Sequence, residues 1–539
     1  MTDSTDGVHP DDAPSHPTSA ATGQPVHTPA SSVGEGPGVE YLDSRDGVVA
    51  DHASDTSGQP SGGSARPGRR RALVAAAVLA VGLVGGGVAY GVGQLSGGGT
   101  QPDERVPASA LAIVSLDLDP SAGQKVDALR FARKFPKVKA RIGSGDDLRK
   151  MLFDAVSDSS DVTASWKDVE PWLGDRAAVA VLPAADELDE PVPVVVLAVK
   201  DEDKARVGLR TAMPTASCEI SDGFAVCAKE AAAAKQAVAD AARKSLSDDS
   251  TYAGDMKTLG DHGILAAWAD LSRVKKAAPD LLSGMGAMGS SLAGATGDLK
   301  GRYVAAVRFD GPHLELAGRV EGAGLPKLSG SADVGDLPKD TLLALGVGNA
   351  DTVVSSAWQR LRTAASGMGA AETFDAQVST LSSTYGISLP DDLVSAVGDQ
   401  LTLAVGPGAG PQVAVRMTGS KDSIDRLLSG VKQASGSMLD VATATSGHAT
   451  VLATDARYAT AVAQGKGLAD TDRFRDAVAD ADGAQGVLYV DLAGLVSAYG
   501  DQLALDAGGT EELKPLSALG VTVHQDGAAL DYRVRLATR

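Results

Sequence analysis

The sequence has few aromatic residues and fewer basic than acidic ones. Phe, Trp and Tyr make up 4% of the 539 residues, so a core built from this chain is aliphatic and rich in small side chains. Lys and Arg number 49 against 69 Asp and Glu, which gives a formal net charge of −20. Binding to a phosphate backbone needs clustered Lys and Arg. We therefore expect no nucleic-acid partner and no wide contact with an anionic membrane surface.

The chain also lacks recognisable catalytic and metal-binding motifs. It contains no G-x-S-x-G or H-E-x-x-H sequence, and its Gly-Asp steps at 174–175 and 398–399 are typical of turns rather than of a phosphate-binding loop. The eight histidines are dispersed, and none has a second His or Cys at metal-ligand spacing. The sequence therefore predicts no cofactor, no metal site and no enzymatic activity.

Four aspartates at strand ends are the strongest candidates for chemistry. Asp117 and Asp119 close one expected strand, while Asp270 and Asp491 hold matching positions at the ends of two others. Paired carboxylates suit acid–base or metal chemistry. An Asp at such a position also caps the following helix by accepting backbone N–H groups. The recurrence at 270 and 491 favours capping, with a cation site or catalysis as the alternatives.

The two cysteines, Cys218 and Cys227, flank a predicted β-hairpin whose turn is Asp222-Gly223. A two-residue loop sets Cys218 directly opposite Cys227, within reach of a disulfide. We expect a structural disulfide, which suits an oxidising compartment outside the cytoplasm. Free thiols and a redox-active pair are the alternatives, although the spacing is not C-x-x-C.

One long apolar run, Ala72–Gly93, contains no charge. As a helix, its residues reach roughly 33 Å, enough to cross a bilayer. Four arginines lie just before the run and only Arg105 follows closely, so the positive-inside rule places the N-terminus in the cytoplasm and the main part outside the cell membrane. A cleaved signal peptide is the rival interpretation, but the preceding tail is too long for one. Membrane lipid is accordingly an expected partner.

Small residues gather on one side of this run, and they predict a helix–helix contact made of Gly82, Gly86, Ala89 and Gly93. Such a surface lets two helices approach closely, which would give a homodimer through the span. The chain has 63 glycines, so composition alone also explains the pattern.

Six short sequences recur in the same order along the chain, among them WLGDRAAVAV from Trp172 and AVGDQLTLAV from Ala396. We predict an α+β fold of two tandem, diverged repeats of antiparallel sheet with helices packed on one face, preceded by one transmembrane helix and a disordered N-terminal tail. The expected segments are a disordered cytoplasmic tail at 1–70, the span at 72–93, a Gly/Pro spacer at 94–105, a first extracytoplasmic repeat at 106–321, a linker at 322–336 and a second repeat at 337–539.

These elements, in this order, resemble an uncharacterised family of actinobacterial single-span membrane proteins, known as domain of unknown function 3352. The likeness rests on the arginine-flanked apolar run, on VPASALAIVSLDLDP from Val106, and on the WADL and YVDL strands that end near Asp270 and Asp491. The resemblance implies topology and location, and it implies no reaction.

Taken together, these features predict a membrane-anchored extracytoplasmic protein with a non-enzymatic binding or scaffold role in the cell envelope. The expected partner is another envelope protein or a small ligand. A sensor that acts through the disordered cytoplasmic tail is the first alternative, and a cell-envelope hydrolase is the second.

Overall fold

The computed structural model describes residues 99–136, 138–139, 149–150, 153, 164–184, 190–277, 300–322, 327–436, 440–465, 467–500 and 513–539. All of them belong to the second of two compact units, Arg66–Arg539. The predicted tail, the predicted span Ala72–Gly93 and its small-residue face (Gly82, Gly86, Ala89 and Gly93) lie outside the described residues.

Eight strands form the first half of the described chain, and short helices connect them. The strands are β1 (Ala112–Asp117), β2 (Leu173–Leu182), β3 (Val192–Val199), β4 (Ser217–Ser221), β5 (Phe224–Ala228), β6 (Leu265–Asp270), β7 (Arg302–Asp310) and β8 (His313–Glu321). The helices are η1 (Pro102–Arg105), α2 (Ala122–Ala132), α5 (Trp166–Val169), α6 (Glu202–Ala212), α7 (Ala231–Arg243), α8 (Ser250–Thr258) and α9 (Leu271–Ala277).

Eight further strands form the second half. They are β9 (Leu343–Gly348), β10 (Gln400–Gly406), β11 (Gln412–Met417), β12 (Ala442–Ser446), β13 (Ala449–Ala453), β14 (Gly486–Val490), β15 (Leu516–Asp526) and β16 (Ala529–Thr538). The helices are α12 (Ala350–Gly367), α13 (Ala371–Tyr385), α14 (Asp391–Val397), α15 (Lys421–Ser435), α16 (Ala456–Gln464), α17 (Asp472–Ala477) and α18 (Leu492–Tyr499).

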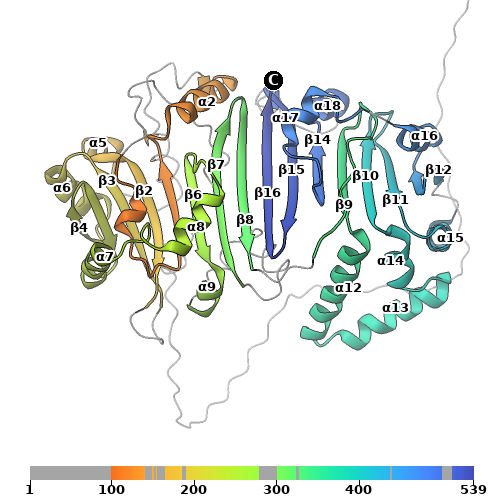
Figure 1. Cartoon of the computed structure of the whole chain (residues 1–539), viewed down its shortest axis with the longest axis horizontal. Coiled ribbons are helices and arrows are strands. Elements are labelled where there is room, and N and C mark those ends of the chain that lie inside the picture. Colours follow the sequence, from red (N-terminus) through yellow and green to blue (C-terminus); the bar gives the residue numbers. More distant parts are fainter. Residues whose placement is uncertain are drawn as a thin grey trace, which may run out of the picture. The chain divides into compact units, whose positions relative to one another are not determined.

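All sixteen strands lie in one antiparallel sheet. Its order is β12-β13-β11-β10-β9-β14-β15-β16-β8-β7-β6-β1-β2-β3-β5-β4. Each half occupies one side of the sheet, and its strands, counted inward from the outer edge, have the same order in both halves. Strands β8 and β16 meet in the middle (Figure 1). Strand β16 therefore holds in the second half the place that β8 holds in the first.

The predicted fold class is wrong, because the chain does not build two sheets but one. Strands β8 and β16 would each leave a row of unpaired backbone groups at a sheet edge. Instead they pair with each other from Ala529–Glu321 to Ala537–His313, and this pairing joins the halves. A strand's hydrophobic pattern does not reveal such a distant partner.

The membrane part of the predicted fold class also needs correction. No helix in the part of the chain that the structure describes is long and apolar enough to cross a membrane. The transmembrane and single-pass features that we predicted are therefore unsupported by the structure.

Helices cover both faces of the sheet, rather than one as predicted. Every residue of β5 is buried. Phe224 and Val226 pack with α7 and α8 in one apolar cluster. Ala225 and Cys227 pack with α5 and α6 in another. Alternate residues of a strand point to opposite faces, so we call the face of Val226 the inner face and the face of Cys227 the outer face.

Candidate functional site

The predicted disulfide is confirmed. Cys218 of β4 is bonded to Cys227 of β5, with Cα atoms 4.0 Å apart. The register of the hairpin is the predicted one, with Glu219 opposite Val226 and Ser221 opposite Phe224. Cys227 is buried against α6. This position suits a structural bond better than a redox-active one, because a redox pair needs access to its partner.

Asp117 and Asp119 lie together, but cations surround them. Nε of Arg176 donates to Asp117 over 3.0 Å, and Lys125 pairs with Asp119. Asp117 also accepts the backbone N–H of Asp119 over 2.8 Å. These contacts hold the loop after β1 against β2. They leave the two carboxylates as parts of an ion-pair cluster rather than as a free acid–base pair.

Asp270 and Asp491 act as helix caps. Asp270 accepts the backbone N–H of Arg273 over 3.0 Å, and Asp491 accepts that of Gly494 over 2.7 Å. Asp491 is the more buried of the two and also pairs with Arg473. The capping interpretation therefore describes both positions.

The histidines that we considered do not converge. His262, His313 and His524 each lie next to a backbone carbonyl oxygen, those of Met256, Asp310 and Asp480 respectively. His448 is exposed at the β12–β13 turn. Within the described residues, no group of three or more His, Cys, Asp or Glu side chains is placed to hold a metal ion.

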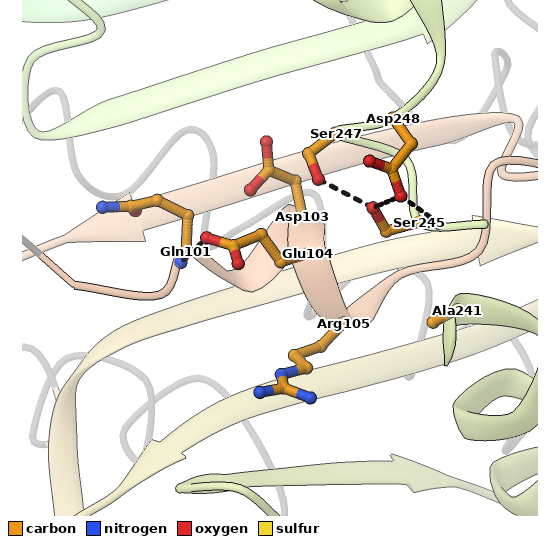
Figure 2. Close-up of a pocket in the computed structure, with 8 residues that line it drawn as sticks. All are labelled: Gln101, Asp103, Glu104, Arg105, Ala241, Ser245, Ser247 and Asp248. Carbon is orange, nitrogen blue, oxygen red and sulfur yellow. Dashed lines mark hydrogen bonds between the residues drawn. The ribbon is translucent and has the colours of Figure 1, made fainter. Parts of the chain in front are cut away.

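One polar cavity of about 470 Å³ lies between η1 and the end of α7 (Figure 2). Burial raises the pKa of Asp103, whose carboxylate accepts a hydrogen bond from the Tyr252 hydroxyl over 3.0 Å. Ser245 donates its hydroxyl to Asp248 over 2.7 Å. Hydrogen bonds from the Ser245 hydroxyl and amide lower the pKa of Asp248, so this carboxylate is a weak base. The contact is a local turn and does not activate Ser245.

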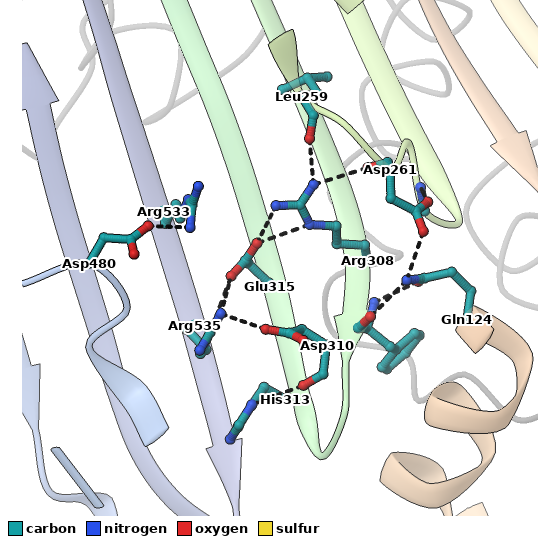
Figure 3. Close-up of polar contacts among 12 residues, drawn as sticks. Gln124, Leu259, Asp261, Arg308, Asp310, His313, Glu315, Asp480, Arg533 and Arg535 are labelled. Atoms are coloured by element: carbon teal, nitrogen blue, oxygen red, sulfur yellow. Dashed lines mark hydrogen bonds and ion pairs between the residues drawn. The ribbon is translucent and has the colours of Figure 1, made fainter. Parts of the chain in front are cut away.

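The second group of polar residues lies where the two halves join (Figure 3). Glu315 of β8 is 1% exposed and lies between Arg308 of β7 and Arg535 of β16. Arg308 donates to Glu315 over 2.6 and 2.9 Å, and Arg535 donates over 2.7 and 3.2 Å. Burial alone would raise the pKa of Glu315, but the hydrogen bonds from Arg535 and Arg308 outweigh burial and lower it. This trio ties three strands together on the inner face.

Beside the trio lies a cavity of about 340 Å³, which we call the junction cavity. Both halves line it. The first half contributes Arg308 and Arg319, and the second contributes Arg533, Asp480 and His524. Arg319 donates to Asp531 over 2.7 Å, and Arg533 pairs with Asp480. The Arg533 and Asp480 side chains are 42% and 60% exposed, so this pair is the most accessible in the group.

Sequence reasoning missed this site. The arginines lie on one face of their strands, Arg308 in RYVAAVRF, Arg319 in HLELAGRVE, and Arg533 and Arg535 in DYRVRLATR, where a solvated strand face would look the same. The only indication of this site in the sequence was therefore a weak one, namely charged residues on one side of otherwise apolar strands. The pairing of β8 with β16 is what brings Arg319 and Arg533 to one cavity.

These features define a large antiparallel-sheet protein whose halves share a strand order, with a structural disulfide and a charged cavity at their junction. A family model described as a protein of unknown function (DUF3352) matches residues 73–212. This match confirms the family resemblance over the segment that leads into β1 and continues through α6. No curated protein matches the chain.

Proposed function

We propose that this chain is a non-enzymatic binding protein of the cell envelope, with its sheet outside the cytoplasm, and that the junction cavity binds a small anionic ligand. The observation that carries the proposal is the position of the cavity. Arginines from two halves of the chain meet in it, although the chain as a whole is strongly acidic. The extracytoplasmic location is supported by the disulfide, since such bonds persist in oxidising compartments.

The size and the charges of the cavity suit this ligand class. Its volume lies at the lower end of the range usual for small-molecule sites. The Arg533–Asp480 pair is exposed, and exposed pairs contribute only about 0–1 kcal/mol. A carboxylate or phosphate group on a ligand can therefore replace Asp480 at little cost. A guanidinium group binds either anion through two parallel hydrogen bonds.

Anion binding can be tested by thermal unfolding of the full chain with inorganic phosphate and with citrate. A ligand that binds only the folded state raises the melting temperature in proportion to the logarithm of its concentration. We expect such a rise for at least one of the two anions, measured against sodium chloride of equal ionic strength. Arg533→Gln should abolish it.

The matched control is Arg362→Gln on α12, because Arg362 is also exposed and paired with an aspartate, Asp375. This variant should keep the full response to the anion. The proposal fails if neither anion raises the melting temperature above the chloride reference. It also fails if Arg362→Gln and Arg533→Gln reduce the response equally.

A further inference from the structure

The outer face carries a continuous apolar row that runs from β7 and β8 of the first half across six strands of the second half. Pairing in register aligns one residue from each of eight neighbouring strands, and none is charged. The row consists of Val307, Leu316, Val534, Val521, Leu488, Leu345, Leu403 and Val415. The neighbouring positions on the same face continue it with Leu343, Val347, Val405, Val490, Leu519 and Val523.

Within the described residues, helices cover the two ends of this row and α18 packs beside β15, while the middle of the row around Leu345 stays partly exposed. Val307 is 6% exposed under Ala128 and Phe131 of α2, and Val415 packs beside α14 and α15. Leu345, near the centre, is 40% exposed. Leu403, Leu488, Val521 and Val534 are also partly exposed. We call the part from Leu403 to Val534 the bare face.

In the first half, helix α2 covers the corresponding part of the outer face. Helix α2 directly follows β1 and buries six of its own residues. In the second half, α12 directly follows β9, yet only Ala350 and Ala365 of its eighteen residues are buried. Leu361 of α12 and Met368, its C-cap, are 58% and 77% exposed. Helix α12 therefore does not take the place over the sheet that α2 takes in the first half.

The dimensions of the bare face fit one helix. Its five strands, at about 4.8 Å each, and about five residues per strand at about 3.4 Å each, give roughly 24 by 17 Å, or about 400 Å². A stable protein dimer buries about 800 Å² per partner, so this area is too small for a second copy alone. An α-helix is 10–12 Å wide with its side chains, and about 16 residues span 24 Å.

We propose that the bare face binds an amphipathic helix of a partner protein, which completes the layer that α2 provides in the first half. The largest apolar patch on a typical monomer covers about 300–600 Å² and is often functional, and a helix laid in an apolar groove is a common mode of recognition. The bare face lies on the opposite side of the sheet from the junction cavity. The proposal made here therefore does not rest on anion binding there.

The test is photo-crosslinking with the full chain in the cells that produce it. A photoreactive amino acid replaces Leu345, and in the control it replaces Val207 on α6, an isolated apolar residue that is 67% exposed. The proposal requires that position 345, and not position 207, crosslinks to a segment of another protein with apolar residues at helical spacing. A crosslink to lipid, to a second copy, or to this chain's own residues overturns it, and so does the absence of any crosslink.

A second measurement excludes chance capture. A synthetic peptide of the crosslinked segment should bind the purified full chain saturably, and Leu345→Asp should weaken binding at least tenfold. Val207→Asp should leave the affinity unchanged. If Leu345→Asp does not fold, Leu345→Ser takes its place, and a peptide that binds both Leu345 variants as tightly as the wild type refutes the proposal.

Discussion

Replacing Glu315 by Gln should destabilise the whole sheet by about 3–5 kcal/mol. Glu315 is 1% exposed, and the Arg308 and Arg535 side chains that flank it are 15% and 13% exposed. Removal of one partner from a buried ion pair costs this much because it leaves an uncompensated buried charge. Among the described residues, Arg308 in this variant keeps only the carbonyl oxygens of Leu259 and Asp261, and Arg535 keeps only the exposed Asp310. Both guanidinium groups would then face a neutral amide, whose NH₂ group is itself a donor. Folded domains are stable by only about 5–15 kcal/mol, so the effect is large.

The assay is urea unfolding of the full chain, followed by circular dichroism and by tryptophan fluorescence. The control is Asp375→Asn, which breaks the exposed Arg362–Asp375 pair and should cost less than about 1 kcal/mol. A second control replaces Arg308, Glu315 and Arg535 together by leucine. It should recover much of the loss, because no buried charge is left. A cost for Glu315→Gln as small as that of Asp375→Asn would refute the reasoning.

The pH dependence of this effect has a defined sign. The pKa of Glu315 in the folded protein lies below its ordinary value of 4.5. Just below pH 4.5 the unfolded chain therefore binds more protons than the folded one. The stability that Glu315 contributes is complete above pH 4.5 and is lost as the pH falls through the lowered pKa. The difference between the wild type and Glu315→Gln should be full at pH 7 and should narrow below pH 4.5.

Three further predictions concern the hairpin and the helix caps. Cys218→Ala with Cys227→Ala should lower the free energy of unfolding by about 2–3 kcal/mol, since the bond closes a short loop; equal stability of the oxidised and reduced wild-type protein in urea unfolding would contradict this. Asp270→Ala should cost about 1 kcal/mol as a lost cap. Asp491→Ala should cost about 2 kcal/mol, because Asp491 also pairs with the half-exposed Arg473. Thermal unfolding of both variants tests this order, and a larger loss of stability for Asp270→Ala than for Asp491→Ala would contradict it.

The parts of the fold that were predictable are those that neighbouring residues determine. The hairpin around Asp222-Gly223 has the predicted register because a two-residue turn leaves no other choice. The junction was not predictable in this way. Glu315 accepts from Arg535 across a pairing of strands that lie in different halves. Nothing in the local pattern of either strand specifies the other, so the single sheet and its charged trio became visible only in three dimensions.

Strand β9 in the second half is apolar on both faces, but in the described structure only its inner face is fully covered. In β9 the residues Leu343, Leu345 and Val347 alternate with the buried Ala344 and Gly346, so the strand is apolar on both faces. Antiparallel strands with one solvated face alternate between apolar and polar residues, and solid apolar runs occur where both faces are covered. The inner face of β9 has its cover, in which Ala344 packs with residues of α16 and α17. Its outer face is apolar in sequence and 40% exposed at Leu345. The sequence of β9 therefore specifies a second cover, which α12 does not supply at Leu345.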